Sequence, residues 1–336
     1  MIKKGRGVAT IMFGFGYGEG FPDHSIASAE INEEGTILIR TASADVGQGV
    51  LTVVAQIAAE VLQVKPEIIK IVEGDTHLTK NSGSTSATRS TFFTGNAVKS
   101  AAAGLLSNIY HYASIYFVTN HVDLGIEDGH VFRIDNPSEK ISYWELAKKF
   151  QNVENNLKAE ASFFPHTDKP EKKNGQGEKL YVAYTFVTQI IDVSVDTDTG
   201  IVNVLHVYSA ADIGKAINPQ NAEGQIEGGT VQGMGMALME EQVIKEGLTL
   251  NADLTGYLAP TSMDIPQFTT RFVENEDSDG PYGAKGIGEP SLIGTTPAIA
   301  NAIYDAIGVR IFSLPITPEK ILKALKEDKK EYRNNQ

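Results

Sequence analysis

Hydrophobic and polar residues alternate in some segments of the chain and follow a helical period in others. Residues 26–43 alternate through two runs separated by the turn-forming string NEEG, which predicts a β-hairpin. Residues 50–62, VLTVVAQIAAEVL, have apolar residues at helical spacing and predict a helix. A second hairpin, with DTG as its turn, is predicted at 190–210, and a helix is predicted to follow at about 225–241.

A short string follows each predicted hairpin and is nearly the same in both places. SADVG occupies 43–47 and AADIG occupies 210–214. Coincidence between two common hairpin patterns is the alternative, but the shared Asp, aliphatic residue and Gly favour an internal duplication. The sequence therefore predicts a mixed α/β (α+β) chain built from two related subdomains of hairpin and helix.

The remaining segments add further elements. Residues 95–118 predict a long helix, and residues 297–307 predict another. Residues 122–149 predict a small insert of strands and a helix, while residues 151–180 are polar and predict a surface loop.

The order of these elements predicts domains of consecutive sequence. We expect a first domain at 1–180, with a small insert at about 120–180, and a second domain at 181–325. A charged and frayed tail is expected at 326–336.

Composition excludes several classes of function. The chain has 29 Lys and Arg against 42 Asp and Glu, a net charge of −13, and no Cys. An acidic surface repels phosphates, so nucleic acid is not an expected partner. Without Cys, the chain cannot hold a disulfide or an iron–sulfur cluster. No apolar run of about 18 residues predicts a membrane helix, and no signal peptide is predicted, so a cytoplasmic protein is expected.

Glycine is concentrated in a few loops, which indicates tight turns and places where backbone approaches a ligand closely. The 32 Gly residues cluster at 14–20, 47–49, 224–235 and 280–288. The first cluster, GFGYGEG, is not a dinucleotide fingerprint, because a strand-like segment follows it where a helix would be required. The seven His residues show no spacing typical of a zinc or non-haem iron site.

Two of the polar loops could bind a phosphorylated ligand. Gly47, Gln48 and Gly49 open a predicted helix, whose free N–H groups would suit an oxyanion, although a tight strand-to-helix turn is the favoured explanation when this string is taken alone. The Ser- and Thr-rich loop at 82–90 offers hydroxyl and N–H groups, with Arg89 as a source of charge. The alternative for this loop is an ordinary solvent-exposed segment.

The string GPYGAKGIGEPSLIG places Lys285 and Glu289 among glycines before a predicted helix. A carboxylate beside bare backbone can approach a small reactive centre and act as a general base. A Glu at a helix N-terminus is the equally favoured alternative, because the helix dipole stabilises it there. Phe13, Phe15 and Tyr17 lie among the first glycines, where they either line a flat pocket or anchor the core.

Taken together, these loops resemble the molybdopterin-binding large subunit of the xanthine dehydrogenase family, the molybdenum hydroxylases. The matching strings are ADVGQG, GSTSATRSTFFTGNAV, DIGKAINP, EGQIEGGTVQGMG and GAKGIGEP, in the family's order and spacing. The resemblance runs from about residue 4 to 325 and covers only the second half of the family's large subunit. It implies a fold of two subdomains of the second molybdenum-cofactor domain type.

The resemblance also implies roles for individual residues. Glu289 corresponds to the family's catalytic base, and Phe13 and Tyr17 fall where relatives place aromatic residues near the substrate. The implied contacts with the cofactor are Gly47, Gln48, Gly49, Ser86, Ala87, Thr88, Ser90, Gln225 and Lys285.

The implied cofactor is molybdenum with molybdopterin cytosine dinucleotide and a terminal sulfido or selenido ligand. The pterin holds the metal, so no protein ligand to it is expected. The implied reaction is hydroxylation of an N-heteroaromatic substrate with water as the oxygen source. Electrons would leave through iron–sulfur clusters and FAD on partner subunits to NAD(P)+, and another subunit would carry the first half of the molybdopterin domain.

A large subunit divided between two chains is similar to the arrangement in nicotinate dehydrogenases. This similarity makes nicotinate the leading substrate, converted to 6-hydroxynicotinate. A purine (xanthine or hypoxanthine) dehydrogenase subunit is the nearest alternative. A non-catalytic assembly subunit and a simple phosphate-ligand binding protein are the others.

Overall fold

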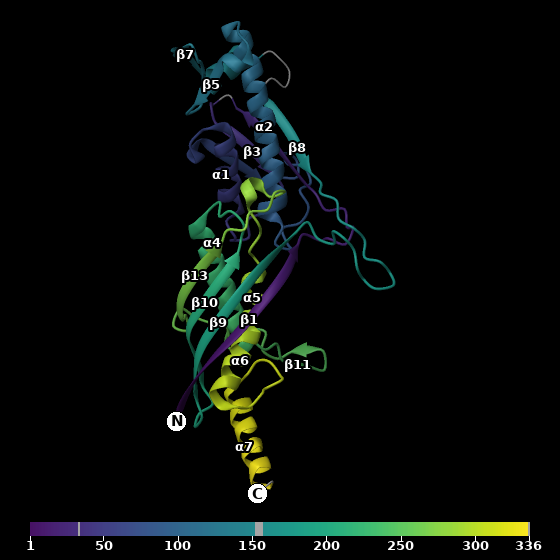
Figure 1. Ribbon diagram of the computed structural model, residues 1–336, viewed down its shortest axis with the longest axis vertical. Coiled ribbons are helices and arrows are strands. Elements are labelled where there is room, and N and C mark those ends of the chain that lie inside the picture. The colour runs from purple at the N-terminus through teal and green to yellow at the C-terminus, as the bar shows by residue number, and fades with distance from the viewer. Residues whose placement is uncertain (33, 152–156, 335–336) are drawn as a thin grey trace. The chain divides into compact units, whose positions relative to one another are not determined.

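The computed structural model describes residues 1–32, 34–151 and 157–334 (Figure 1). The chain divides into two compact units, each assembled from separate stretches of sequence. Unit 1 comprises Met1–Phe13, Tyr184–Asn275 and Ile287–Gln336, and unit 2 comprises Gly14–Ala183 and Glu276–Gly286.

Unit 2 contains a four-stranded sheet in the order β4-β3-β2-β8. Its strands are β2 (Ser25–Ile31), β3 (Ile37–Thr41), β4 (Ile69–Glu73) and β8 (Lys158–Phe163). Strand β2 pairs antiparallel with β3 and β8, whereas β3 and β4 are parallel. Alternate residues of β2 are buried, which is the period of a strand with one covered face.

Two helices pack in unit 2, namely α1 (Val50–Leu62) and α2 (Ser90–Phe117), and α2 contacts both β2 and β8. The insert consists of β5 (Leu124–Glu127), β6 (His130–Arg133), β7 (Asn136–Ser142) and α3 (Tyr143–Lys149). A capping box begins α3, because Ser142 and Glu145 satisfy each other's backbone N–H groups. Short 3₁₀ turns lie at Pro66–Ile68, His121–Asp123 and Pro281–Gly283.

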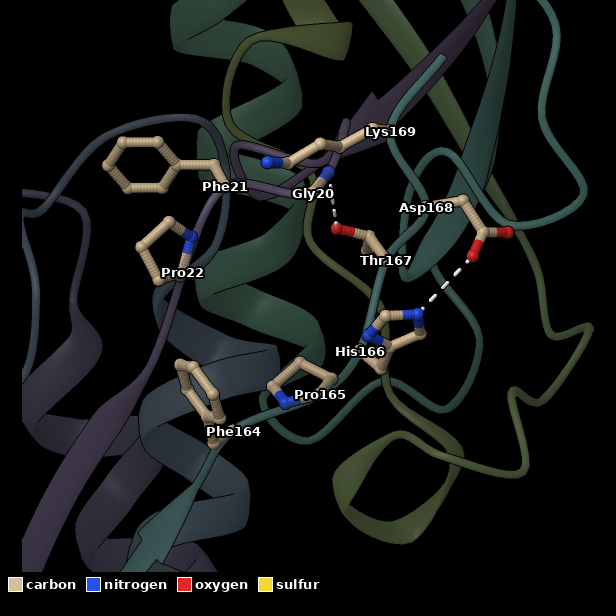
Figure 2. Close-up of a pocket in the computed structure, with 9 residues that line it drawn as sticks. All are labelled: Gly20, Phe21, Pro22, Phe164, Pro165, His166, Thr167, Asp168 and Lys169. Atoms are coloured by element: carbon tan, nitrogen blue, oxygen red, sulfur yellow. Dashed lines mark hydrogen bonds and ion pairs between the residues drawn. The ribbon is translucent and has the colours of Figure 1, made fainter. Parts of the chain in front are cut away.

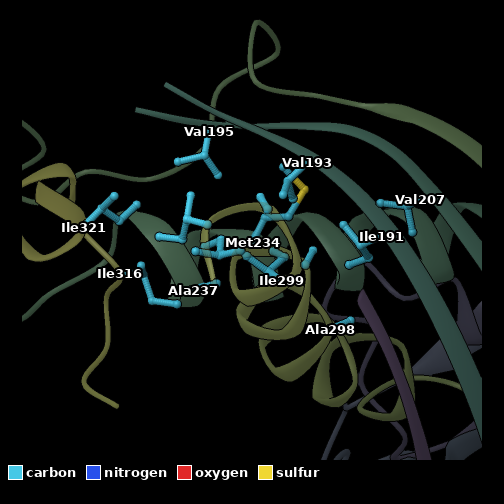
Figure 3. Close-up of a cluster of buried hydrophobic side chains, with 14 residues drawn as sticks. Ile191, Val193, Val195, Val207, Met234, Ala237, Ala298, Ile299, Ile316 and Ile321 are labelled. Atoms are coloured by element: carbon cyan, nitrogen blue, oxygen red, sulfur yellow. The ribbon is translucent and has the colours of Figure 1, made fainter. Parts of the chain in front are cut away.

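Unit 1 contains a second four-stranded sheet in the order β1-β9-β10-β13. Its strands are β1 (Ile2–Phe15), β9 (Ala183–Asp196), β10 (Val202–Asp212) and β13 (Gln267–Val273), and a small hairpin is formed by β11 (Ile244–Lys245) and β12 (Leu248–Thr249). Its helices are α4 (Pro219–Leu238), α5 (Pro290–Ile293), α6 (Thr295–Ile307) and α7 (Pro318–Asn334). Aliphatic side chains of β9 and β10 pack against α4 and α6 to form its core (Figure 3).

The two sheets have matching topologies, which supports the predicted duplication. In each, a hairpin is followed by a helix and then by a strand parallel to the second hairpin strand, β4 beside β3 and β13 beside β10. The fourth strand is exchanged, since β1 precedes β2 in sequence but pairs with β9, and β8 precedes β9 but pairs with β2. The compact units therefore differ from the consecutive ranges 1–180 and 181–325.

Most predicted elements are confirmed, including both hairpins, the helix at 50–62 and the insert. The loop predicted at 151–180 is wrong in part, because β8 pairs with β2, and residues 152–156 lie outside the described range. The frayed tail at 326–336 is also wrong, since α7 continues to Asn334, and the last two residues lie outside the described range.

Among the described helices, none has the length and apolar character needed to cross a bilayer.

Glycine allows β1 to lie directly on a helix. A Cβ atom placed on Gly7 would lie 2.0 Å from the carbonyl oxygen of Ala298 and 2.3 Å from the nitrogen of Ala302, both in α6. Because these contacts are backbone atoms, neither can rotate away. Strand β1 therefore needs Gly at this position to stay in contact with the helix.

Gly7→Ala should lower the free energy of unfolding by about 1–3 kcal/mol, since overpacking shifts backbone. Urea titration measures this change. Gly224→Ala in α4 is the matched control, because no atom lies within 4 Å of a Cβ there. That control should be neutral or stabilising by up to about 1 kcal/mol. Equal midpoints for Gly7→Ala and the wild type would contradict the close contact.

Candidate functional site

Segments distant in sequence meet in unit 2 at the predicted residues. The Gly16 N–H donates to the carbonyl of Ala87 at 2.9 Å. A Cβ on Gly286 would lie 2.1 Å from the carbonyl oxygen of Thr88, so the backbone at Gly286 lies directly against the Ser- and Thr-rich loop. The structure thereby brings three of the predicted loops together.

The backbone at the centre of this meeting point is strained. Ala87 and Thr88 have φ values of 50° and 54°, in the left-handed region that favours Gly. For a β-branched residue such as Thr88, this conformation is rare. Strained backbone of this kind persists only where its surroundings hold it, and it is concentrated at functional sites.

Arg89 holds this strained loop in place. Its side chain is 1% exposed, and its Nε lies 2.9 Å from the carboxylate of Asp23. It also donates to the carbonyls of Ser82, at 2.9 Å, Ser84, at 3.0 Å, and His24. The prediction that Arg89 offers charge to a ligand is wrong, because its donors are committed to the interior.

Tyr17 directs its hydroxyl group to the same loop. The phenol oxygen lies 2.5 Å from Ser86 Oγ and also contacts Ser84 Oγ. Hydrogen bonding to Ser84 and Ser86 lowers the pKa of Tyr17. The ring is 37% exposed, which leaves part of it open to a ligand. Ser90, the first residue of α2, is half-buried.

The other two aromatic residues near the first glycines differ from each other. Phe15 is fully buried, with its ring 5.0 Å from that of Phe92, so it is a core residue. Phe13 belongs to unit 1 and is half-buried in β1. Of the three aromatics, Phe15 is therefore excluded as a ligand contact.

The GQG loop differs from the predicted open anion site. Asp45 Oδ1 accepts from the N–H groups of Gly47, at 2.9 Å, and Gly49, at 3.2 Å, while Oδ2 accepts from Leu51 at 3.3 Å. The Gln48 amide folds back, donating to the Ala44 carbonyl and accepting from the Val46 N–H. The N–H groups of Gly47, Gly49 and Leu51 are thus already bonded to a side chain of their own loop.

Asp45 is a structural residue that the sequence prediction missed. Its signal was an Asp two residues before a Gly that opens a helix, which is typical of a loop cap. Partial burial raises the pKa of Asp45, but hydrogen bonds from the backbone of Gly47, Leu51 and Gly49 outweigh it, and the net pKa is lowered.

In unit 1, α4 carries the predicted contact Gln225 on a helix unusually rich in glycine. A Cβ on Gly229 would lie 1.8 Å from Ser291 Oγ, so this Gly is required by packing. At Gly224 and Gly228, in contrast, a Cβ would meet no described atom within 4 Å. Each Gly in a helix costs about 1 kcal/mol relative to Ala, and packing within the described chain does not account for these two.

Glu289 is half-buried and immediately precedes α5, whose N-cap it forms. Its carbonyl accepts from the N–H groups of Leu292 and Ile293, at 3.1 and 3.4 Å. Lys285, four positions earlier, is 8% exposed and belongs to unit 2. Glu289 is thus held at the start of α5 by hydrogen bonds to its own carbonyl.

A pocket of about 520 Å³ lies in unit 2 (Figure 2). It is lined by apolar and polar residues, namely Gly20, Phe21, Pro22, Phe164, Pro165, His166, Thr167, Asp168 and Lys169. The ring of Phe21 lies 4.9 Å from that of Tyr17, but none of the predicted site residues lines the pocket.

Among the described residues, no three His, Asp or Glu side chains form a group that could hold a metal ion.

Comparison with known proteins identifies the family. A model of the molybdopterin cofactor-binding domain matches residues 1–266. The chain belongs to the xanthine dehydrogenase family of molybdenum hydroxylases. It corresponds to the C-terminal molybdopterin-binding region, and the resemblance found in the sequence is confirmed.

Two relatives illustrate the match within the molybdenum hydroxylases. The 6-hydroxypseudooxynicotine dehydrogenase complex subunit gamma of Paenarthrobacter nicotinovorans is 32% identical over 330 residues, which cover 95% of this chain and 39% of that protein. The aldehyde oxidoreductase of Megalodesulfovibrio gigas is 35% identical over 328 residues, covering 96% of this chain and 32% of that protein.

A solved structure confirms the fold. Quinoline 2-oxidoreductase from Pseudomonas putida 86 superposes with a TM-score of 0.82 at 28% identity, covering 97% of this chain and 42% of that one. The mixed α/β class and the molybdenum-hydroxylase domain type are therefore as predicted. The chain spans 32–42% of the length of these relatives.

Asp45→Asn tests the cap of the GQG loop. Because folding lowers the pKa of Asp45, its stabilisation is present above the ordinary Asp pKa and is lost as pH falls through the folded value. The variant should lose about 1 kcal/mol of stability at pH 7, as lost caps do. That difference should shrink as pH falls below about 4. Urea titrations at pH 7 and pH 3 measure it, and a loss that is the same at both would contradict the assignment.

Proposed function

We propose that this chain is the molybdopterin-binding subunit of a molybdenum hydroxylase that hydroxylates an N-heteroaromatic substrate, with Glu289 as the general base. The observation that carries the proposal is Glu289 itself, a half-buried carboxylate at the end of the GAKGIGEP loop, in a chain of this family. A general base must be held near the reacting atom and must not be sealed in the core. The half-buried position of Glu289 suits that role.

Other described residues fit a pterin dinucleotide. The exposed face of α4 at Gly224 and Gly228 leaves backbone uncovered beside Gln225, so a flat or phosphorylated ligand could approach it closely. The loop at Ser86, Ala87, Thr88 and Ser90 offers hydroxyl groups on a backbone that is already held in shape. These features support the proposed cofactor contacts.

The GQG loop supports a narrower role than free N–H donation. Asp45 already uses the N–H groups of Gly47 and Gly49, so these are not available to a phosphate in this arrangement. The contribution left to Gln48 is its side chain, which would have to turn away from its own loop to reach a ligand.

When bound, the cofactor would supply a molybdenum centre that takes two electrons from the substrate. The residues of this chain would then orient the substrate and move a proton. The Glu289 carboxylate would accept a proton from the water-derived nucleophile, while the ring of Tyr17 would pack against a planar substrate. Stacking of this kind contributes about 0.5–1.5 kcal/mol beyond burial.

Nicotinate, giving 6-hydroxynicotinate, is the leading substrate. Relatives whose names specify nitrogen heterocycles favour this class, among them nicotine 6-hydroxylase from Paenarthrobacter nicotinovorans and the quinoline oxidoreductase above. A probable hypoxanthine oxidase of Escherichia coli, 34% identical, favours a purine as the second candidate.

Partner subunits are part of the proposal. The residues described here correspond to about a third to two-fifths of the length of the relatives that they match. The proposed partners are a subunit with the first half of the molybdopterin domain and subunits with iron–sulfur clusters and FAD. These would pass electrons to NAD(P)+.

Glu289→Gln keeps the size of the side chain and removes the base. The turnover rate of the complex should fall about 10²–10⁴-fold, the usual range for a lost general base. The molybdenum content, measured by elemental analysis, should stay near the wild-type value. Turnover within about tenfold of the wild type would exclude Glu289 from this role.

Purification through a tag on this chain, from cells that express the whole complex, tests partners and substrate together. The expected result is co-purification of larger subunits with molybdenum, iron and FAD. Nicotinate, xanthine, hypoxanthine and an aldehyde are then assayed with NADP+ and NAD+ in turn. Turnover of purines alone would move the assignment to the purine class, and a preference for aldehydes would rule out an N-heteroaromatic substrate. A metal-free, partner-free monomer would leave a phosphate-ligand binding protein as the better explanation.

A further inference from the structure

A fully buried amide links one strand of unit 1 to three helices. Gln189 in β9 is 0% exposed, and its Nε2 donates to Thr230 Oγ1 in α4 at 2.8 Å and to the Ser291 carbonyl in α5 at 3.0 Å. Its Oε1 accepts from Thr295 Oγ1 in α6 at 3.0 Å. Both polar ends of the amide are therefore satisfied by side chains and backbone of separate elements.

Gln189 is unexpected at this position. The neighbouring inward residues of β9, Val187 and Ile191, are aliphatic and belong to hydrophobic clusters. Burying an amide costs about 1–3 kcal/mol unless its hydrogen bonds are made. An aliphatic residue would pack here without that demand, so the amide is explained by the groups that it connects.

Ser291 continues the connection toward the proposed base. Its Oγ donates to the Gly288 carbonyl at 2.6 Å, and its N–H donates to the same carbonyl at 3.3 Å. This carbonyl belongs to the peptide bond whose nitrogen is that of Glu289. The chain of contacts from Gln189 thus ends on the backbone that carries the Glu289 side chain.

Glycine makes the arrangement possible. A Cβ on Gly229 would lie 1.8 Å from Ser291 Oγ, and a Cβ on Gly294 would lie 2.9 Å from Gln189 Oε1. Ser291 and Thr295 are each 0% exposed. The amide is therefore enclosed by close contacts on several sides, and α5 has little room to shift.

We propose that Gln189 is a positioning residue that acts through Ser291 to fix the Glu289 carboxylate for proton transfer. This inference rests on the proposed role of Glu289 as base. The hydrogen bonds that run from Gln189 through Ser291 to the Gly288 carbonyl are called the clamp below. A displacement of about 1 Å at a reacting group can cost on the order of 10²-fold in rate. Loss of the clamp should therefore lower turnover without removing any group that touches the substrate.

Gln189→Met in the whole complex keeps the volume and removes the hydrogen bonds. The expected result is a kcat about 10- to 100-fold lower, with KM nearly unchanged, a shifted acid limb of the pH–kcat profile, and normal molybdenum content. Thr185→Val is the matched control, because Thr185 is a buried residue of the same strand whose hydroxyl donates to the Asp212 carbonyl in β10. The control should keep its kcat within about twofold. Equal losses of kcat in both variants would overturn the proposal.

A double-mutant cycle separates positioning from a general structural effect. In the Glu289→Gln background, Gln189→Met should lower kcat no further, since the group that it positions is already gone. A multiplied loss would overturn the proposal. If Gln189→Met does not fold, Ser291→Ala, which removes only the hydroxyl bond to Gly288, enters the same cycle with the same two outcomes.

Hydrogen exchange gives a readout that does not depend on activity. Peptides covering 287–294 should exchange faster in Gln189→Met than in the wild type or in Thr185→Val, and unchanged exchange would overturn the clamp. The two hypotheses fail differently. Full activity of Glu289→Gln would refute the base while the exchange result still reports on the clamp. An inactive Glu289→Gln with a fully active Gln189→Met would refute the clamp alone.

Discussion

Each of the two large sheets is completed by a strand that comes from the other repeat, and this exchange constrains the rest of the structure. Strand β1 pairs with β9, and β8 pairs with β2, although each precedes a different hairpin in sequence. At the far end of β1, Thr197 Oγ1 donates to the Met1 carbonyl across 196 positions. Neither repeat supplies all four strands of its sheet, so each sheet is completed only by pairing over a long sequence separation, which is typical of slow folding.

Close backbone contact is the means by which this framework places polar groups. Gly7, Gly229 and Gly286 each lie so near another element that a Cβ would overlap it. The elements that meet there carry or adjoin the proposed site residues, including Thr88 and Glu289. Their polar groups are then held by buried side chains, Arg89 in unit 2 and Gln189 in unit 1. Glycine allows the elements to approach each other closely, and the buried side chains of Arg89 and Gln189 fix the orientation of the polar groups that they bind.

The sequence predicted the helix at 50–62 and both hairpins well, because a strong apolar period or alternation with a clear turn marks each one. It failed where long-range pairing decides the structure, as for β8, whose polar surroundings resemble a loop. The residues of the candidate site could be named from motifs, but their hydrogen bonding could not be predicted. The folding of Gln48 onto its own loop, the burial of Arg89 and the capping by Asp45 depend on neighbours that pattern alone does not reveal.

The left-handed conformation of Ala87 and Thr88 has a consequence for any ligand that this loop takes. Flexible loops lose conformational entropy when they bind, and that loss is subtracted from affinity. This loop loses its conformational entropy when the chain folds, because Arg89 and the backbone of Gly16 and Gly286 hold the loop in shape without a ligand. A loop ordered in advance binds rigid partners tightly but adapts poorly to others. The shape that this loop would offer to the proposed ligand is therefore set when the chain folds, before any ligand binds.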